Sequence, residues 1–107
     1  MTQRIILAGL EPTAFEKITL NSTAVSLNST TRAAGGSVLR MSVETANARF
    51  RDDGTAPTKV IGVVLQSGAA YEFLGYNGTS SLKFCGDAGA ASVLNVQRYA
   101  HVGDQQL

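Results

Sequence analysis

The segment Val38-Leu39-Arg40-Met41-Ser42-Val43-Glu44-Thr45 decides the fold class. Leu39, Met41 and Val43 alternate along it with Arg40, Ser42 and Glu44. Successive side chains of a β-strand point to opposite faces, so the alternation predicts a strand with one apolar and one polar face. Such a strand is typical of an antiparallel sheet that packs on a core with one face only.

Similar segments recur along the chain and are separated by turn residues. The turns contain Gly, Asp, Asn or Pro, as in Asp52-Asp53-Gly54 and Asn77-Gly78. No window shows the apolar spacing of an amphipathic helix, and the polar, Gly-rich segment 28–37 is expected to be a loop. We therefore predict an all-β fold, a single-domain antiparallel β-sandwich or jelly roll of about eight short strands. The further expected strands are 15–20, 23–27, 47–51, 59–65, 69–74, 81–85 and 91–99.

The two ends of the chain differ from this pattern. The 107 residues form one domain, and we expect an N-terminal arm at 1–14 and an irregular C-terminal tail at 100–107. The arm contains the apolar residues Ile5, Ile6, Leu7 and Leu10, which need a cover. That cover is either a neighbouring subunit or, if the segment is the first strand, the sandwich of the chain itself.

The composition points to binding rather than to catalysis. Charged residues make up 16% of the chain, against about 25% in a typical soluble domain. A weakly charged surface suits burial against another subunit, although a monomer with a Ser/Thr-rich surface has the same composition. The net charge is +1 and no run of Lys or Arg reaches three, so neither nucleic acid nor a membrane is an expected partner.

The sequence contains no recognisable catalytic or metal-binding set. His101 is the single histidine and Cys85 the single cysteine, whereas a zinc site needs several such ligands. Cys85 is expected to be a buried thiol. The pair Asp52-Asp53 suits a turn better than a calcium site. We expect no catalytic residue, no metal, no cofactor and no enzymatic activity.

The most specific local pattern is Arg49-Phe50-Arg51-Asp52-Asp53-Gly54-Thr55. Arg49 and Arg51 share one strand face beside two aspartates, and guanidinium groups bind carboxylates in a bidentate way. The result is either an ion pair within the chain that fixes the turn or an ion pair between subunits. The candidate interface residues are therefore Ile5, Ile6, Leu7, Leu10, Arg49, Arg51, Asp52 and Asp53.

The segment from Ala48 to Tyr99 resembles a family of small virion-associated proteins of tailed bacteriophages. The resemblance rests on residues 48–58, Gly62-Val63-Val64-Leu65, Gly68 before an aromatic strand, and Leu94-Asn95-Val96 leading to Tyr99. It implies a virion structural protein that is synthesised in the bacterial cytoplasm. The role that we expect is that of a capsid decoration protein. Such a protein binds the shell as a symmetric homo-oligomer, with a trimer favoured, and bridges subunits of the major capsid protein or another virion protein.

An alternative is a tail- or neck-associated β-module that binds a partner protein or a host surface carbohydrate. Sugar sites usually present exposed aromatic rings beside acidic and amide groups. Four of the seven aromatic residues, Phe50, Tyr71, Phe73 and Phe84, lie on faces that are expected to point inward, which disfavours this alternative.

Overall fold

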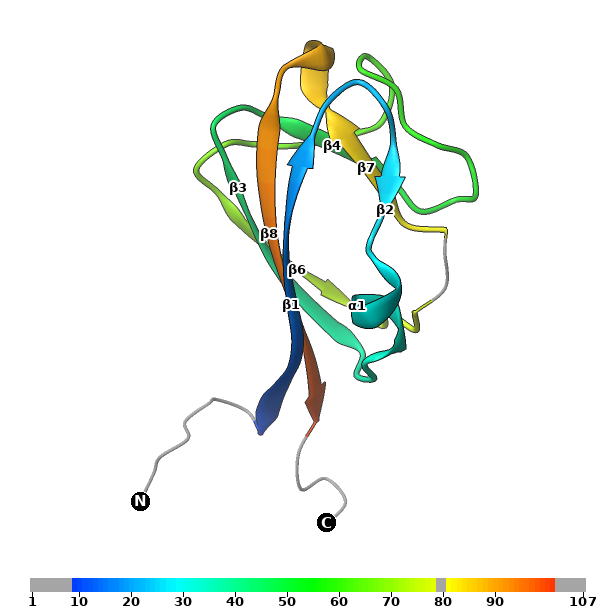
Figure 1. The fold of residues 1–107 in the computed structure, drawn as a ribbon, viewed down its shortest axis with the longest axis vertical. Coiled ribbons are helices and arrows are strands. Elements are labelled where there is room, and N and C mark those ends of the chain that lie inside the picture. The colour runs from blue at the N-terminus through cyan, green and yellow to red at the C-terminus, as the bar shows by residue number, and fades with distance from the viewer. Residues whose placement is uncertain (1–8, 79–80, 102–107) are drawn as a thin grey trace.

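The protein is a sandwich of two four-stranded antiparallel sheets, seen in a computed structural model that describes residues 9–78 and 81–101 (Figure 1). Sheet I has the strand order β1-β8-β3-β6, and sheet II has the order β2-β7-β4-β5. The strands are β1 (Leu10–Leu20), β2 (Val25–Ser26), β3 (Val38–Glu44), β4 (Ala48–Arg51), β5 (Val63–Leu65), β6 (Ala70–Leu74), β7 (Lys83–Gly86) and β8 (Ser92–His101). The all-β sandwich predicted from the sequence is confirmed.

The strand order identifies the topology as a jelly roll. β1 pairs with β8, β2 with β7, β3 with β6 and β4 with β5, all antiparallel. These nested pairs are those of one long hairpin, β1 to β4 against β5 to β8. Rolling the hairpin adds the pairs β3–β8 and β4–β7 and separates the strands into two sheets. Eight strands in this double Greek-key arrangement form a jelly roll.

The core lies between the sheets and follows the alternation of the sequence. Leu39, Met41 and Val43 of β3 are at most 2% exposed, and Leu94 and Val96 of β8 lie beside them in the same core cluster. Sheet II contributes Ala48, Leu65 and Phe84. Both sheets bury their apolar faces against each other, which is the main source of stability in such a fold.

The predicted strand 59–65 is shorter than expected. Only Val63–Leu65 pair with β4, because residues 58–61 form a tight turn. The Thr58 amide donates to the Ile61 carbonyl over 2.9 Å, and Thr58 Oγ1 accepts from the amides of Val60 and Ile61. A threonine hydroxyl that binds the backbone competes with strand pairing in this way. Gly62, at a φ of +140°, then redirects the chain into β5.

The predicted loop 28–37 contains a short helix, α1 (Ser29–Ala33), so the expectation of a purely irregular segment is wrong. The Asn28 side chain accepts from the Thr31 amide over 2.8 Å and caps the helix. Asn is among the residues that most favour this position. A single turn is too short to show an apolar repeat, which is why the pattern of apolar residues missed it.

The strands of sheet I extend closer to both ends of the chain than the sequence predicted. β1 begins at Leu10, so residues 10–14 of the predicted arm belong to a strand that pairs with β8, with a register shift between Pro12 and Ala14. β8 continues through His101, which pairs with Leu10, so the predicted tail does not begin at 100. Leu10 is only 8% exposed, so its side chain is buried within the single chain, although it lies outside the main core cluster. Ile5, Ile6 and Leu7 lie outside the described residues.

A buried arginine closes one end of the sandwich. Arg98 of β8 is 3% exposed and follows Leu94 and Val96 on the inner face. Its guanidinium donates to the carbonyls of Thr31 (3.0 Å), Arg32 (2.8 Å) and Gly36 (2.9 Å). Two of these carbonyls belong to the last turn of α1, where helix carbonyls begin to lack partners within the helix. The Thr31 carbonyl also accepts from the Ala34 amide over 3.3 Å. Arg98 therefore joins β8 to the segment that leads into β3.

Replacing Arg98 by Met keeps the length of the side chain but removes the donors. Each buried carbonyl left without a partner costs about 1–3 kcal/mol, so we expect Arg98→Met to lower the free energy of unfolding by about 3 kcal/mol or more. Urea denaturation measures the change. Arg40→Met, which removes an exposed arginine from the neighbouring strand β3, is the control and should cost much less. Equal losses in the two variants would show that the buried hydrogen bonds contribute little.

The aromatic cluster gives a second stability test. The Phe84 side chain is fully buried, and the Phe50 ring lies 4.9 Å from Phe73 and 6.4 Å from Phe84 but remains partly exposed. We expect Phe84→Ala to cost about 3–5 kcal/mol and Phe50→Ala less, though more than about 1 kcal/mol. Urea denaturation ranks the two variants. A loss below that bound at Phe50 would place its side chain outside the core.

Candidate functional site

An open groove lies at the β5 edge of sheet II. It has a volume of about 370 Å³ and is lined by Arg51, Asp52, Asp53, Ile61, Gly62 and Val63. Ile61 is 53% exposed and Val63 57% exposed. Val60, at 63%, continues the apolar surface along the turn before β5. The groove thus has apolar side chains on one side and charged side chains on the other.

The charged side of the groove is fixed by a local network. Arg51 Nε donates to Asp53 Oδ1 over 3.1 Å, and the Thr55 amide donates to the same oxygen over 3.2 Å. Both interactions favour the carboxylate, and the hydrogen bond from Arg51 is the main reason why the pKa of Asp53 lies below its usual value. The ion pair of Arg51 is therefore the one within the chain that fixes the turn.

Arg49 does not line this groove, although it contacts one of the lining residues from behind. Its Nε is 2.6 Å from Asp87 Oδ1, and its Nη1 donates to the Gly62 carbonyl over 2.9 Å. Arg49 therefore ties β4 to the turn after β7 and to the residue before β5. Of the eight candidate interface residues, the structure brings together Arg51, Asp52 and Asp53, whereas Arg49 and Leu10 serve contacts within the chain.

Sequence reasoning did not identify the apolar residues of the groove as a surface. Val60, Ile61 and Val63 belong to a segment, Lys59-Val-Ile-Gly-Val-Val-Leu65, whose two faces are both apolar. Because β5 is an edge strand and most of the segment is a turn, its side chains do not all reach the core. An apolar segment without alternation was the available signal.

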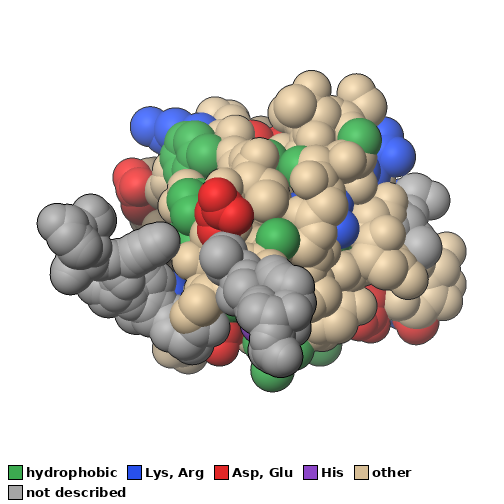
Figure 2. All heavy atoms as spheres, turned by 90° about the horizontal axis from the view of Figure 1, so that it is seen from below, with side chains coloured by type: hydrophobic (Ala, Val, Ile, Leu, Met, Phe, Trp, Pro, Cys, Tyr) green, Lys and Arg blue, Asp and Glu red, His purple; other side chains and the backbone are tan. Residues whose placement is uncertain are grey.

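Groups able to perform nucleophilic or metal chemistry are dispersed. In 9–78 and 81–101, no three His, Cys, Asp or Glu side chains gather as metal ligands would. Cys85 is fully buried, and burial raises the pKa of its thiol, although Arg49 partly opposes the effect. His101 is exposed at the end of β8. On the face that Figure 2 shows, acidic and basic side chains are interspersed with uncharged and hydrophobic ones.

Comparisons with protein-family models, with curated proteins and with solved structures found no match. Within the described part of the chain, no helix is long and apolar enough to cross a membrane. The groove and the faces of the two sheets are therefore the evidence on function that the fold provides.

The Arg51–Asp53 contact has a direct spectroscopic test. We expect the Asp53 carboxyl to titrate below the usual Asp range, and its pKa to rise toward that range in Arg51→Gln. Because the pKa of Asp53 is lower in the folded state, the contact stabilises the fold at pH values above the ordinary Asp pKa. This stabilisation is lost as the pH falls through the lowered pKa. NMR titration of the carboxyl carbon measures both values.

Arg49→Gln is the matched control for this titration, because Arg49 pairs with Asp87 instead. It should leave the Asp53 titration unchanged. An Asp53 pKa that is the same with and without Arg51 would contradict the assigned ion pair.

Proposed function

We propose that this protein is a non-enzymatic structural component of a bacteriophage virion that binds a neighbouring protein subunit through the β5-edge groove. One observation supports the protein-binding part most directly. Ile61 and Val63, each more than half exposed, lie next to the fixed Arg51–Asp53 pair. An apolar centre with a polar rim is the usual composition of a protein interface. The virion assignment rests on the sequence resemblance.

Burial of the exposed apolar side chains of this groove favours docking. Full burial of a Val or Ile side chain contributes about 1.5–3 kcal/mol, so each half-exposed side chain here offers roughly 1 kcal/mol on docking. Val60, Ile61 and Val63 together supply a modest gain per subunit. A weak contact repeated around a symmetric oligomer or a shell suffices, because each added contact stabilises the assembled state only.

Recognition at this edge relies on side chains rather than on backbone pairing. β5 has only three residues, and the bridge between Thr58 and Ile61 closes the segment before it. A short edge strand offers few free backbone groups to an added strand. The partner that we propose therefore has an apolar surface that fits over Ile61 and Val63, with polar groups facing Arg51 and Asp53.

The copy number of the chain in purified particles distinguishes the two virion roles. A capsid decoration protein, which we favour, is expected in hundreds of copies, and a neck or tail component in tens or fewer. Quantitative mass spectrometry of particles of the phage that encodes the chain measures this number. Absence of the chain from the particles would contradict the virion assignment.

Charged substitutions test the groove. We expect Ile61→Asp combined with Val63→Asp to reduce binding to particles that lack the chain at least about tenfold, because each change places a charge in a desolvated contact. Sedimentation of particles with the added protein measures bound chain. Leu74→Asp, at a 74% exposed position of sheet I, is the control. Binding of the double variant that equals that of wild type would exclude this groove as the interface.

A further inference from the structure

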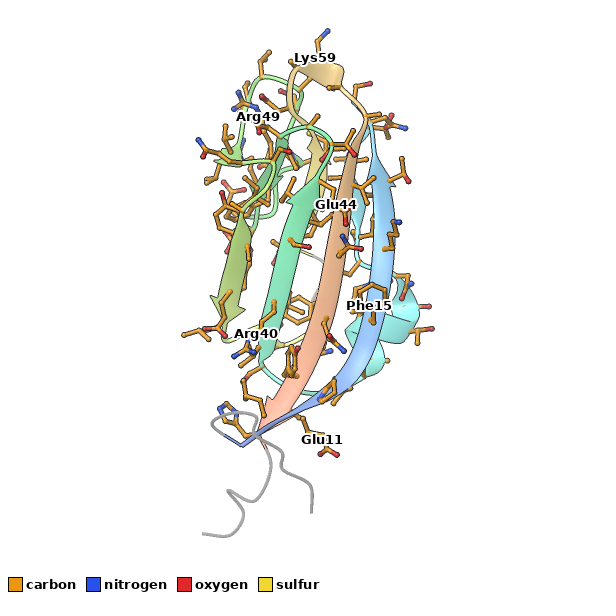
Figure 3. The ribbon with its side chains drawn as sticks, turned by 90° about the vertical axis from the view of Figure 1, so that its left-hand side faces the viewer. Glu11, Phe15, Arg40, Glu44, Arg49 and Lys59 are labelled. Carbon is orange, nitrogen blue, oxygen red and sulfur yellow. The ribbon has the colours of Figure 1, made fainter. Side chains whose placement is uncertain are left out.

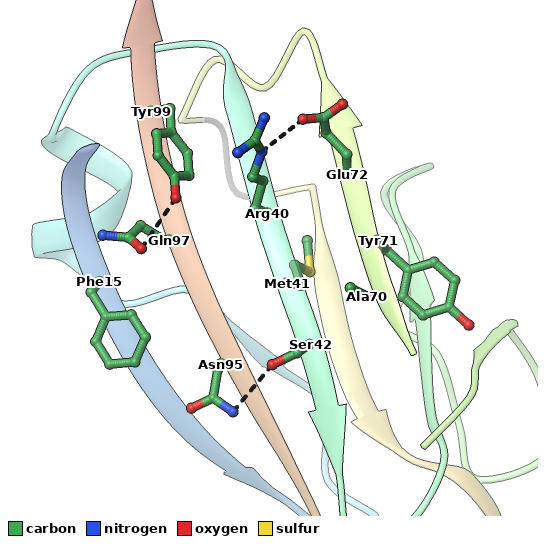
Figure 4. A pocket seen from close by; sticks show the side chains of 10 residues that line it. All are labelled: Phe15, Arg40, Met41, Ser42, Ala70, Tyr71, Glu72, Asn95, Gln97 and Tyr99. Carbon is green, nitrogen blue, oxygen red and sulfur yellow. Dashed lines mark hydrogen bonds and ion pairs between the residues drawn. The ribbon is translucent and has the colours of Figure 1, made fainter. Parts of the chain in front are cut away.

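A second open groove, of about 520 Å³, lies on the outer face of sheet I (Figure 4). Figure 3 shows Phe15, Arg40 and Glu44 on this face, which points away from sheet II. The groove is separate from the β5 edge, because its lining residues come from β1, β8, β3 and β6. The lining side chains on which the argument rests are Phe15, Arg40, Glu72, Asn95, Gln97 and Tyr99.

The side chains form a row across the whole sheet. Phe15 pairs with Gln97, Gln97 with Arg40, and Arg40 with Glu72. Neighbouring strands lie about 4.8 Å apart, so this row extends over about 14 Å from one sheet edge to the other. Its order is an aromatic ring, an amide and an ion pair. Such a row can contact an elongated ligand at several successive points.

Phe15 is the apolar end of the row. Its side chain is 59% exposed, although Ile18 and Leu20 of the same strand point into the sandwich. An exposed phenyl ring costs hydration free energy that the fold does not recover. The flat ring can instead stack against an apolar ligand face. The polar side chains around Phe15 indicate what else such a ligand must contain.

The amides of the groove are held in place and retain unused hydrogen-bonding groups. The Tyr99 hydroxyl donates to Gln97 Oε1 over 3.3 Å (Figure 4). Asn95 Nδ2 donates to Glu44 Oε2 over 2.5 Å and, at 3.4 Å, also lies near Ser42 Oγ. Within 9–78 and 81–101, Gln97 Nε2 and Asn95 Oδ1 make no hydrogen bond. One is a donor and the other an acceptor. A ligand with hydroxyl groups, each both a donor and an acceptor, satisfies the two together.

The charges of the face are balanced. Arg40 and Glu72 form an ion pair at 2.8 Å, and the Arg40 guanidinium lies 5.0 Å from the centre of the Tyr99 ring. Lys17 and Glu44 add one charge of each sign to the same face. A balanced surface provides no net attraction for a polyanion such as nucleic acid. The ligand that fits is neutral.

We propose that the outer face of sheet I is a binding site for a neutral oligosaccharide. One face of a sugar ring is formed by C–H groups and stacks on Phe15. The hydroxyls of that ring and its neighbours bind Gln97, Asn95 and the Arg40–Glu72 pair. A protein partner would bury a more apolar centre than one phenyl ring among amides and ions. The site is independent of the virion assignment and of the β5-edge groove.

The test uses the full chain labelled with ¹⁵N and a panel of neutral oligosaccharides with glucose, galactose, mannose, xylose or N-acetylhexosamine backbones. We expect saturable shifts of the Asn95 and Gln97 side-chain amide signals with at least one member of the panel. Phe15→Ala should weaken that binding about tenfold or more, the factor that corresponds to about 1.4 kcal/mol. Gln97→Ala should weaken it as well.

Leu74→Ala is the matched control, because Leu74 is an exposed apolar residue of the same sheet that does not line the groove. It should bind like wild type. The proposal is overturned if no neutral oligosaccharide gives saturable shifts. It is also overturned if Phe15→Ala binds like wild type, or if the groove responds only to an acidic oligosaccharide or to a protein subunit.

Discussion

The guanidinium of Arg98 holds together parts of the chain that the two sheets alone do not connect. β8 lies between β1 and β3 in sheet I, and Arg98 extends from its inner face to the carbonyls of α1 and Gly36. The Tyr76 ring covers the guanidinium at 4.7 Å, and burial raises the pKa of its hydroxyl although Arg98 opposes this shift. A charge in this place is tolerated because carbonyl dipoles and an aromatic face replace water around it.

The glycines of this end show how close the packing is. Gly36 has a φ of +103°, and a Cβ there would meet the Tyr99 carbonyl oxygen at 2.1 Å. At Gly78 a Cβ would meet the Arg32 carbonyl oxygen at 2.5 Å. Both positions need the backbone to approach without a side chain, in a conformation that glycine adopts readily. The Arg98 hydrogen bonds and these close approaches therefore depend on one another.

The fold class could be predicted from the sequence more fully than the contacts of Arg98 or the extent of the edge strand β5, and the reason is physical. Strand alternation is a local property, so the inward residues of β3 and the single core followed from the sequence. Arg98 continues the inward set of Leu94 and Val96, but its partners are carbonyls of a distant segment that no local pattern specifies. The predicted extent of β5 was wrong for a similar reason. Apolar residues on both faces of the segment do not reveal which residues pair in the sheet and which form a turn at its edge.

The candidate surfaces were predictable only in part. The Arg51–Asp53 contact is between near neighbours in sequence, so one of the two expected outcomes for that motif was the observed one. Arg49 lies on the same strand face as Arg51 but forms an ion pair with Asp87 instead. Asp87 is close to Arg49 only because β4 pairs with β7. The four aromatic residues expected to point inward do contribute to the core. Phe15 and Tyr99 nevertheless remain on the outer face of sheet I, where they weaken the argument against sugar binding.

The ion pairs of the fold further reduce the free charge of a chain that already contains few charged residues. Three ion pairs, Arg40–Glu72, Arg49–Asp87 and Arg51–Asp53, use six of the charged side chains within the described residues, and Arg98 is buried. Much of the charge that the chain has is thus neutralised or enclosed by the fold itself. The two grooves reflect this: the face of sheet I has balanced charges, and the β5 edge of sheet II combines exposed apolar side chains with an internally paired Arg51 and Asp53. Because desolvating neutral surface costs less than desolvating ions, both surfaces suit uncharged partners, and their places on different sheets allow both to be occupied at once.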